Sequence, residues 1–176
     1  MTNRIQINRN NEFQYIKFLK REGAPITPEE NSTVISEDSR ALALMELDLD
    51  KVLFYRFKEE YPNHYISEKK FFDSLIGSGL VPLDAKIFET LLRNPERIPR
   101  SWEEKKIISF YGTRLSEKDI PGAGESRGEE SRDEEGNLEN SAMVFCLMFE
   151  EYGKKWTWCC PMPDNVYTLE SACIKI

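Results

Sequence analysis

Hydrophobic residues recur every three or four positions in two neighbouring segments, the spacing that places side chains on one side of an α-helix. The stripes consist of Phe71, Phe72, Leu75 and Ile76 in the first segment and of Ile87, Phe88, Leu91 and Leu92 in the second. Ser67 can cap the first helix, which Gly77 and Gly79 end, and the second covers about residues 84–93. We therefore predict a helix pair over residues 67–93.

The chain before residue 50 carries weaker helical patterns. Residues 11–22 place apolar side chains at helical spacing and are followed by glycine and proline, which end a helix. Residues 23–38 read as a loop. Residues 39–47 are rich in Ala, Leu, Met and Glu, which favour a helix.

From residue 105 onward, apolar runs of strand length replace the helical spacing. The pattern predicts strands over 106–115, 142–150 and 155–160, and residues 166–175 can supply a further one. Residues 51–57 favour another strand through their Val, Phe and Tyr content, with a helix as the alternative. Gly112 marks a bulge or a close approach of another backbone, and Gly153 lies in a hairpin turn. The predicted fold class is α+β, with a small antiparallel, hairpin-based β-sheet packed by two or three helices.

A strongly acidic segment separates two of the predicted strands. Residues 116–140 hold nine acidic and three basic residues, and so carry −6 of the formal net charge of −7. Their few apolar side chains cannot offset the entropy lost on ordering, so we expect a mobile acidic loop. The expected plan is an N-terminal helical arm and linker over 1–38, followed by a single α+β domain over 39–176 that contains this loop.

The rest of the 176-residue chain has a net charge near −1, which predicts neither a polyanion-binding nor an acid-rich surface. The sequence has no run of about 18 apolar residues, so no membrane span is expected. The N-terminal residues lack the apolar core of a secretory signal. The four cysteines fit buried, reduced thiols, and we expect a cytoplasmic protein.

Four short motifs occur in a fixed order over about two thirds of the chain, from Leu47 to Cys160: "LDLDKV", "PLDAKIFETLLRNPERIPRSWEEKK", "FYGT" and "KKWTWCC". Together they resemble a set of short uncharacterised bacterial proteins with the pattern LDLxKV, LDAKxFxxLxxN, LIPxSWKEK, DGT and GKWYW. The chain departs from this pattern at Tyr111, in its acidic insert, and in "CCPMPDNVY", which replaces a WLDxDW run. No activity is assigned to this family, so the resemblance implies a shared fold unit and no particular reaction.

Candidates for metal or nucleophilic chemistry are few. A zinc site uses four Cys or His ligands, but His64 is the only histidine, and Cys159 and Cys160 would point to opposite faces of a strand. A Cys–His pair would require His64, in a predicted exposed turn, to meet a cysteine. We expect no metal or cofactor and assign no catalytic residue. An unrecognised hydrolase is kept as one alternative.

Nucleic-acid binding is a second alternative, because two short helices across a Gly-containing turn resemble a helix-turn-helix. Its candidate contacts are Arg93, Arg97 and Arg100 in "RNPERIPR". Residues 67–106 hold eight basic and seven acidic side chains, and a net charge of +1 attracts phosphate weakly.

The stretch "KKWTWCCPMP" carries the leading functional hypothesis. Trp156 and Trp158 share one strand face, and the neighbouring strand "VFCLMF" is apolar on both faces, with Phe145 and Phe149 on one of them. Helices can cover one face, while the other needs a second layer, the N-terminal arm or another molecule. These aromatic residues are either internal core or an interaction face. The leading function is a non-enzymatic cytoplasmic module that binds another protein, of unknown identity, through this aromatic sheet face.

Overall fold

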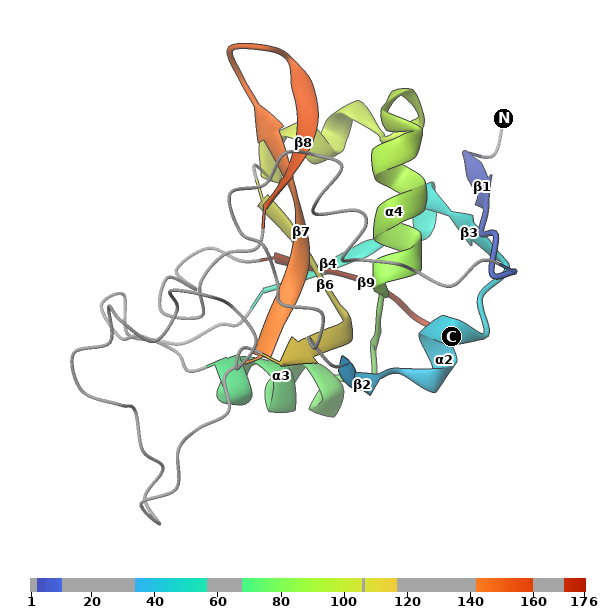
Figure 1. Ribbon diagram of the computed structural model, residues 1–176, viewed down its shortest axis with the longest axis vertical. Helices are drawn as coiled ribbons and strands as arrows, with labels where there is room; N and C mark the ends of the chain where they lie inside the picture. Colours follow the sequence, from blue (N-terminus) through green and yellow to red (C-terminus); the bar gives the residue numbers. More distant parts are fainter. Residues whose placement is uncertain (1–2, 11–33, 57–67, 106, 117–141, 160–169) are drawn as a thin grey trace, which may run out of the picture.

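A computed structural model describes residues 3–10, 34–56, 68–105, 107–116, 142–159 and 170–176, which form a mixed α+β fold (Figure 1). The strands are β1 (Arg4–Gln6), β2 (Val34–Glu37), β3 (Glu46–Asp48), β4 (Leu53–Tyr55), β5 (Val81–Pro82), β6 (Ile107–Ser116), β7 (Ala142–Glu150), β8 (Lys155–Cys159) and β9 (Glu170–Ile174). The α-helices are α2 (Ser39–Leu42), α3 (Glu68–Gly77) and α4 (Ala85–Arg93). Short 3-10 helices are η1 (Leu49–Lys51), η2 (Pro95–Arg97) and η3 (Arg100–Lys105).

Seven strands form one sheet, whose main path runs β4-β9-β6-β7-β8, with β2 paired to β6 and β5 paired to β9. The predicted α+β class is confirmed, and the sheet is larger than expected. It is also mixed, because β9 runs parallel to β6 and antiparallel to β4. Small, buried side chains explain the central position of β9: Ser171, Ala172 and Cys173 are all inaccessible to solvent, and such residues fit between covered faces.

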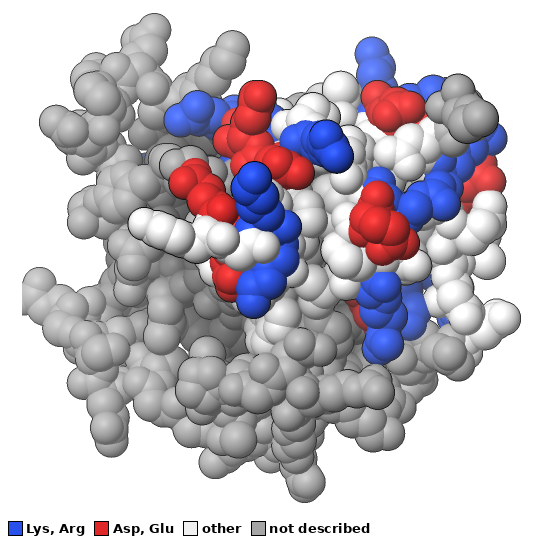
Figure 2. All heavy atoms as spheres, turned by 90° about the horizontal axis from the view of Figure 1, so that it is seen from above, with Lys and Arg blue, Asp and Glu red and all other residues white. Residues whose placement is uncertain are grey.

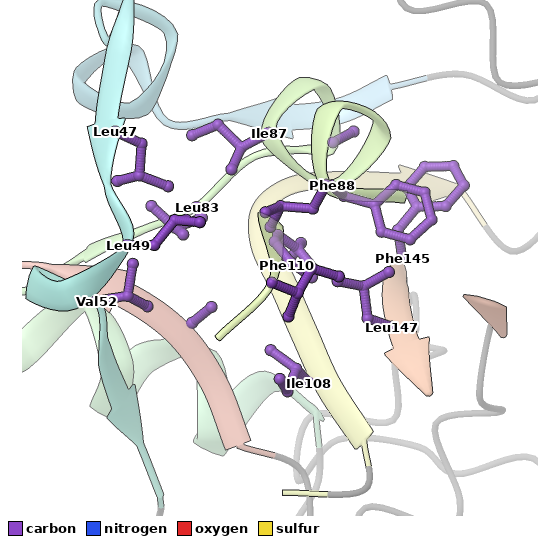
Figure 3. Packing of buried hydrophobic residues seen from close by; sticks show 14 of the residues in the cluster. Leu47, Leu49, Val52, Leu83, Ile87, Phe88, Ile108, Phe110, Phe145 and Leu147 are labelled. Carbon is purple, nitrogen blue, oxygen red and sulfur yellow. The ribbon is translucent and has the colours of Figure 1, made fainter. Parts of the chain in front are cut away.

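A helix covers each face of this sheet. On one face, Phe71 and Leu75 of α3 lie in a cluster with Tyr111, Val144, Cys146 and Cys173. On the other face, Ile87, Phe88 and Leu91 of α4 lie in a cluster with Ile108, Phe110, Phe145 and Leu147, shown in Figure 3. Successive residues of a strand point to opposite faces, so β6 and β7 supply side chains to both clusters. The apolar character of both faces of β7 follows from this arrangement.

The α4 side also receives a small second sheet. β1 and β3 pair antiparallel, and the pairing aligns Ile5 with Leu47. Both residues, together with Leu49, are buried in the α4-side cluster. The helix predicted over residues 39–47 is therefore wrong in its second half. It ends at Leu42, and Glu46–Asp48 forms β3, because a buried leucine between two polar residues suits a half-exposed strand.

Of two further predictions for segments before the helix pair, one is partly wrong and one is confirmed. The loop predicted over 23–38 is wrong at its end, where Val34–Glu37 forms β2 and pairs with β6. The strand predicted over 51–57 is confirmed as β4. The helix predicted over 11–22 and the acidic loop at 116–140 lie outside the described residues, apart from Ser116 at the end of β6. The pairings of β1 and β2 connect parts of the predicted arm to the two sheets.

Candidate functional site

The β7–β8 hairpin carries the aromatic residues that the sequence singles out. Its register aligns Phe149 with Trp156 and Leu147 with Trp158, so the two tryptophans do share one strand face. This face is the α4 side, where both tryptophans are partly buried against the core cluster. In Figure 1 the hairpin projects beyond the described helices and strands, at the top of the view.

Phe145 belongs to the core. Its side chain is inaccessible to solvent, and its ring stacks on that of Phe88 of α4, with 5.0 Å between ring centroids (Figure 3). A partner therefore has no access to this member of the predicted aromatic face in the folded protein. The accessible aromatic residues lie nearer the hairpin turn.

Three partly buried side chains and one exposed side chain form what we call the aromatic hairpin surface. The partly buried members are Phe149, Trp156 and Trp158, and the rings of the first two lie 5.2 Å apart. Tyr152 occupies the turn and exposes its full side chain, at 108 % of the reference area. Tyr152 is not among the residues of the predicted aromatic face. An aromatic residue within the polar turn "EEYGKK" is the signal that could have identified it.

The charges beside this surface compensate one another. Lys155 Nζ lies 3.3 Å from Glu150 Oε2 across the hairpin, and both side chains are exposed enough for the pair to be weak. Glu151 and Lys154 are exposed in the turn. Two acidic and two basic residues therefore surround Tyr152, and their formal charges cancel.

The three arginines of the predicted basic strip, Arg93, Arg97 and Arg100, have different surroundings. Arg93 forms an ion pair with Glu89, with 2.8 Å between Nη2 and Oε1. Arg97 donates a hydrogen bond from Nη2 to the main-chain oxygen of Arg4 at 2.7 Å, and Arg100 is exposed in η3. Figure 2 shows basic and acidic side chains interspersed on the face that it presents. This mixture offers a phosphate backbone no continuous basic area on that face.

The arrangement of α3 and α4 differs from that of a helix-turn-helix. α3 and α4 pack on opposite faces of the sheet. Between them, Val81–Pro82 forms β5 and pairs with β9, so they are not joined by a simple turn. A helix-turn-helix requires two helices packed against each other, so that the second can enter a groove. The helix pair therefore has a structural role, which is to cover the sheet.

A buried polar junction at the start of α4 joins two of the motifs that carry the family resemblance. Asp84 is 1 % exposed, and its Oδ1 accepts a hydrogen bond from the main-chain nitrogen of Ile87 at 2.9 Å as a helix N-cap. Its Oδ2 pairs with Arg9. Thr113 Oγ1 accepts from the main-chain nitrogen of Ala85 at 3.1 Å.

Arg9 and Gly112 lie beside this junction, and their contacts explain why an arginine and a glycine occupy these positions. Arg9 also donates to the main-chain oxygens of Leu44 and Ala41, at 3.0 and 2.8 Å. A Cβ at Gly112 would lie 2.6 Å from the main-chain oxygen of Pro82, which confirms a close backbone approach. Residues of the fold thus satisfy the Asp84 carboxylate of "LDAK" and the Thr113 hydroxyl of "GT", which gives both side chains a structural role.

Among the four cysteines of the chain, the described residues include two whose burial is known. They contain no group of three or more His, Cys, Asp or Glu side chains that could hold a metal ion. Burial raises the pKa of the Cys173 thiol to about 12, which keeps it protonated and a poor nucleophile near neutral pH. Cys146 is also buried. His64 and Cys160 lie outside the described part of the chain.

Comparison of the chain with protein-family models, with curated proteins and with solved structures found no match. The resemblance to short bacterial proteins therefore stays a prediction. Among the described helices, none combines the length and apolar character needed to cross a membrane.

Proposed function

We propose that this chain is a non-enzymatic module that binds another protein through the aromatic hairpin surface. The full exposure of Tyr152 at the tip of the projecting hairpin carries this proposal. An aromatic side chain that stays exposed in the folded protein contributes little to the free energy of folding, because its apolar area is not buried. Burial of its ~150–250 Å² on a partner would contribute several kcal/mol, at ~25 cal/mol per Å².

The neighbouring pair Phe149 and Trp156 supports the same site. Each is half-buried, so the fold already restricts their rings while leaving part of each accessible. Partly ordered aromatic residues make effective interface anchors, because little rotamer entropy is lost on binding. A cytoplasmic location is part of this proposal, and the free, buried thiol of Cys173 supports it.

Photo-crosslinking in the native cell tests the proposed function. The photoreactive residue p-benzoylphenylalanine would replace Tyr152 in one variant and Met45 in a control variant. Met45 is 56 % exposed and lies between α2 and β3, away from the hairpin (Figure 1). We expect a discrete adduct with a second protein from position 152 and none of that mass from position 45. Equal adduct patterns at both positions, or no adduct at position 152, would contradict the proposed function.

A further inference from the structure

Lys154, in the turn of the β7–β8 hairpin, has a backbone conformation that lysine rarely adopts. Its φ angle is 47°, and among the described residues no other residue except a glycine has a positive φ. In this region the Cβ of an L-residue crowds the main chain, whereas glycine carries no such cost. Gly153 directly precedes Lys154 but lies outside this region. Lysine thus occupies the position of the turn where the backbone favours glycine, which indicates that its side chain has a use.

The side chain of Lys154 is available for such a use. It is exposed, and it forms no ion pair or hydrogen bond with a residue that the structure describes. The other charges of the turn differ in this respect, because Lys155 pairs with Glu150 and Glu151 is not without a partner. The formal charges of the turn cancel, but the ammonium of Lys154 is the one that these contacts leave uncompensated.

We propose that Lys154 determines the specificity of the aromatic hairpin surface, and that its ammonium pairs with a carboxylate of the partner protein. This carboxylate would lie at the rim of the apolar pocket that receives Tyr152. The inference rests on the proposed function and deepens it, because it states the chemistry of the partner, which is an apolar pocket beside an acidic side chain.

The hairpin presents both residues to one partner surface. Only Gly153 separates Tyr152 from Lys154 in the sequence, and the tip projects beyond the described helices and strands (Figure 1). The pairing of Glu150 with Lys155 closes the turn, so the main chain between them is fixed before a partner binds. Burial of the aromatic ring would supply affinity, while a charge pair at the rim adds selectivity and speeds association.

A carboxylate suits this position better than the phosphates of a nucleic acid. A single carboxylate can lie beside Lys154 alone. A nucleic-acid backbone brings a row of negative charges, which Glu150 and Glu151 in the same turn would repel. We therefore assign the uncompensated charge to the recognition of a protein.

Substitutions of Lys154 separate binding from folding. The probe is p-benzoylphenylalanine at position 152, and the yield of the photo-crosslinked adduct per amount of folded chain is compared among the parent, Lys154→Gly, Lys154→Asn and Lys154→Arg. Glycine and asparagine accept a positive φ and remove the charge, whereas arginine keeps it. The control is Lys155→Asn, which removes the same charge from the neighbouring lysine that pairs with Glu150.

We expect Lys154→Gly and Lys154→Asn to lower the adduct yield at least about threefold, as loss of one charge pair at an interface rim does. Lys154→Arg and Lys155→Asn should keep most of the adduct. Added salt should lower the yield of the parent more than that of Lys154→Gly. In urea unfolding, Lys154→Gly should have the midpoint of the parent or a higher one, because glycine relieves the backbone strain. Weaker binding would then come from a fold at least as stable.

An adduct yield that is unchanged in Lys154→Gly, or that falls equally in Lys155→Asn, would overturn the inference and leave the proposed function standing. A clearly lower urea midpoint for Lys154→Gly would also overturn it, because the conformation of Lys154 would then carry no strain. An adduct that nuclease removes would identify a nucleic-acid partner and would overturn both proposals, as would the absence of any adduct at position 152 in the parent.

Discussion

Gly112 is the residue where the structure requires the absence of a side chain. A Cβ there would lie within 3 Å of main-chain atoms of Pro82, Leu83 and Asp84. These atoms belong to β5 and the start of α4, and backbone does not yield as the end of a flexible side chain does. The sequence predicts a bulge or a close approach at this position, and the structure identifies which backbone approaches it.

Gly112→Ala is therefore expected to lower the free energy of unfolding by about 1–3 kcal/mol, the usual cost of inserting a methyl group into packed structure. Gly77→Ala is the matched control, because no atom lies within 4 Å of the added Cβ at that position in α3. Alanine also favours a helix over glycine, so the control should be neutral or slightly stabilising. Urea unfolding of both variants measures the difference, and an equal effect of the two would contradict the close approach.

The Cys173 thiol gives a pH-dependent prediction. Burial raises its pKa from an ordinary value of 9.0 to about 12 in the folded protein. Folding thus favours the protonated thiol, and this contribution to stability is complete below pH 9 and is lost as the pH rises from 9 toward 12. Replacing Cys173 by Ala should make the free energy of unfolding less steeply dependent on pH between 9 and 11, measured by urea unfolding. Equal slopes for the two proteins would show that the thiol titrates normally.

At the scale of elements, the ion pair of Arg9 and Asp84 holds the N-terminal segment against α4. Their side chains are 14 % and 1 % exposed. Arg9 also donates hydrogen bonds to the main-chain oxygen of Ala41, within α2, and to that of Leu44, which follows α2. Arg4 and Glu46 form a comparable pair across β1 and β3, but with side chains 49 % and 41 % exposed. Comparing the two pairs therefore separates the effect of burial on stability from that of charge pairing alone.

Arg9→Met should cost about 3–5 kcal/mol of stability, because it leaves the Asp84 carboxylate buried without its cation. Arg4→Met should cost less than about 1 kcal/mol, as exposed ion pairs usually do. The measurement is the free energy of urea unfolding for each variant beside the parent. Similar small losses in both would mean that Asp84 gains water or another donor when Arg9 is removed.

Periodicity predicted the long elements, since α3, α4 and β6 to β8 each carry a clear apolar pattern. It did not predict β2, β3 and β5, which have two to four residues each and too few positions to show a period. Their pairing depends on distant strands, and β3 for example forms because Leu47 aligns with Ile5. The position of β9 beside β6 likewise depends on tertiary packing around its small side chains, which the local sequence does not determine.

At the scale of the whole molecule, the core and the proposed binding surface use different aromatic residues. Phe88 and Phe145 are inaccessible and stack between α4 and the sheet, whereas Tyr152 is fully exposed. The sequence indicated the hairpin and its tryptophans but could not rank its aromatic residues by accessibility. That ranking depends on where α4 lies, and α4 covers Phe145.

Alanine substitutions should reproduce this division. Phe88→Ala is expected to lower the free energy of unfolding by about 3–5 kcal/mol through lost burial and a residual cavity. Tyr152→Ala should change it by less than about 0.5 kcal/mol, as substitutions of exposed residues usually do. Denaturant unfolding of the two variants measures both values. A loss of several kcal/mol for Tyr152→Ala would assign this residue to the core.

The most direct test of the aromatic hairpin surface is the yield of the photo-crosslinked adduct at position 152, with and without Trp156→Ala, per amount of folded chain. Trp156 contacts Phe149 and does not carry the reactive group, so a loss of adduct would report lost binding. We predict that Trp156→Ala lowers the affinity by more than about 2 kcal/mol, as removal of a central interface residue does, and that most of the adduct disappears. An adduct yield equal to that of the parent would contradict the assignment of this surface to protein binding.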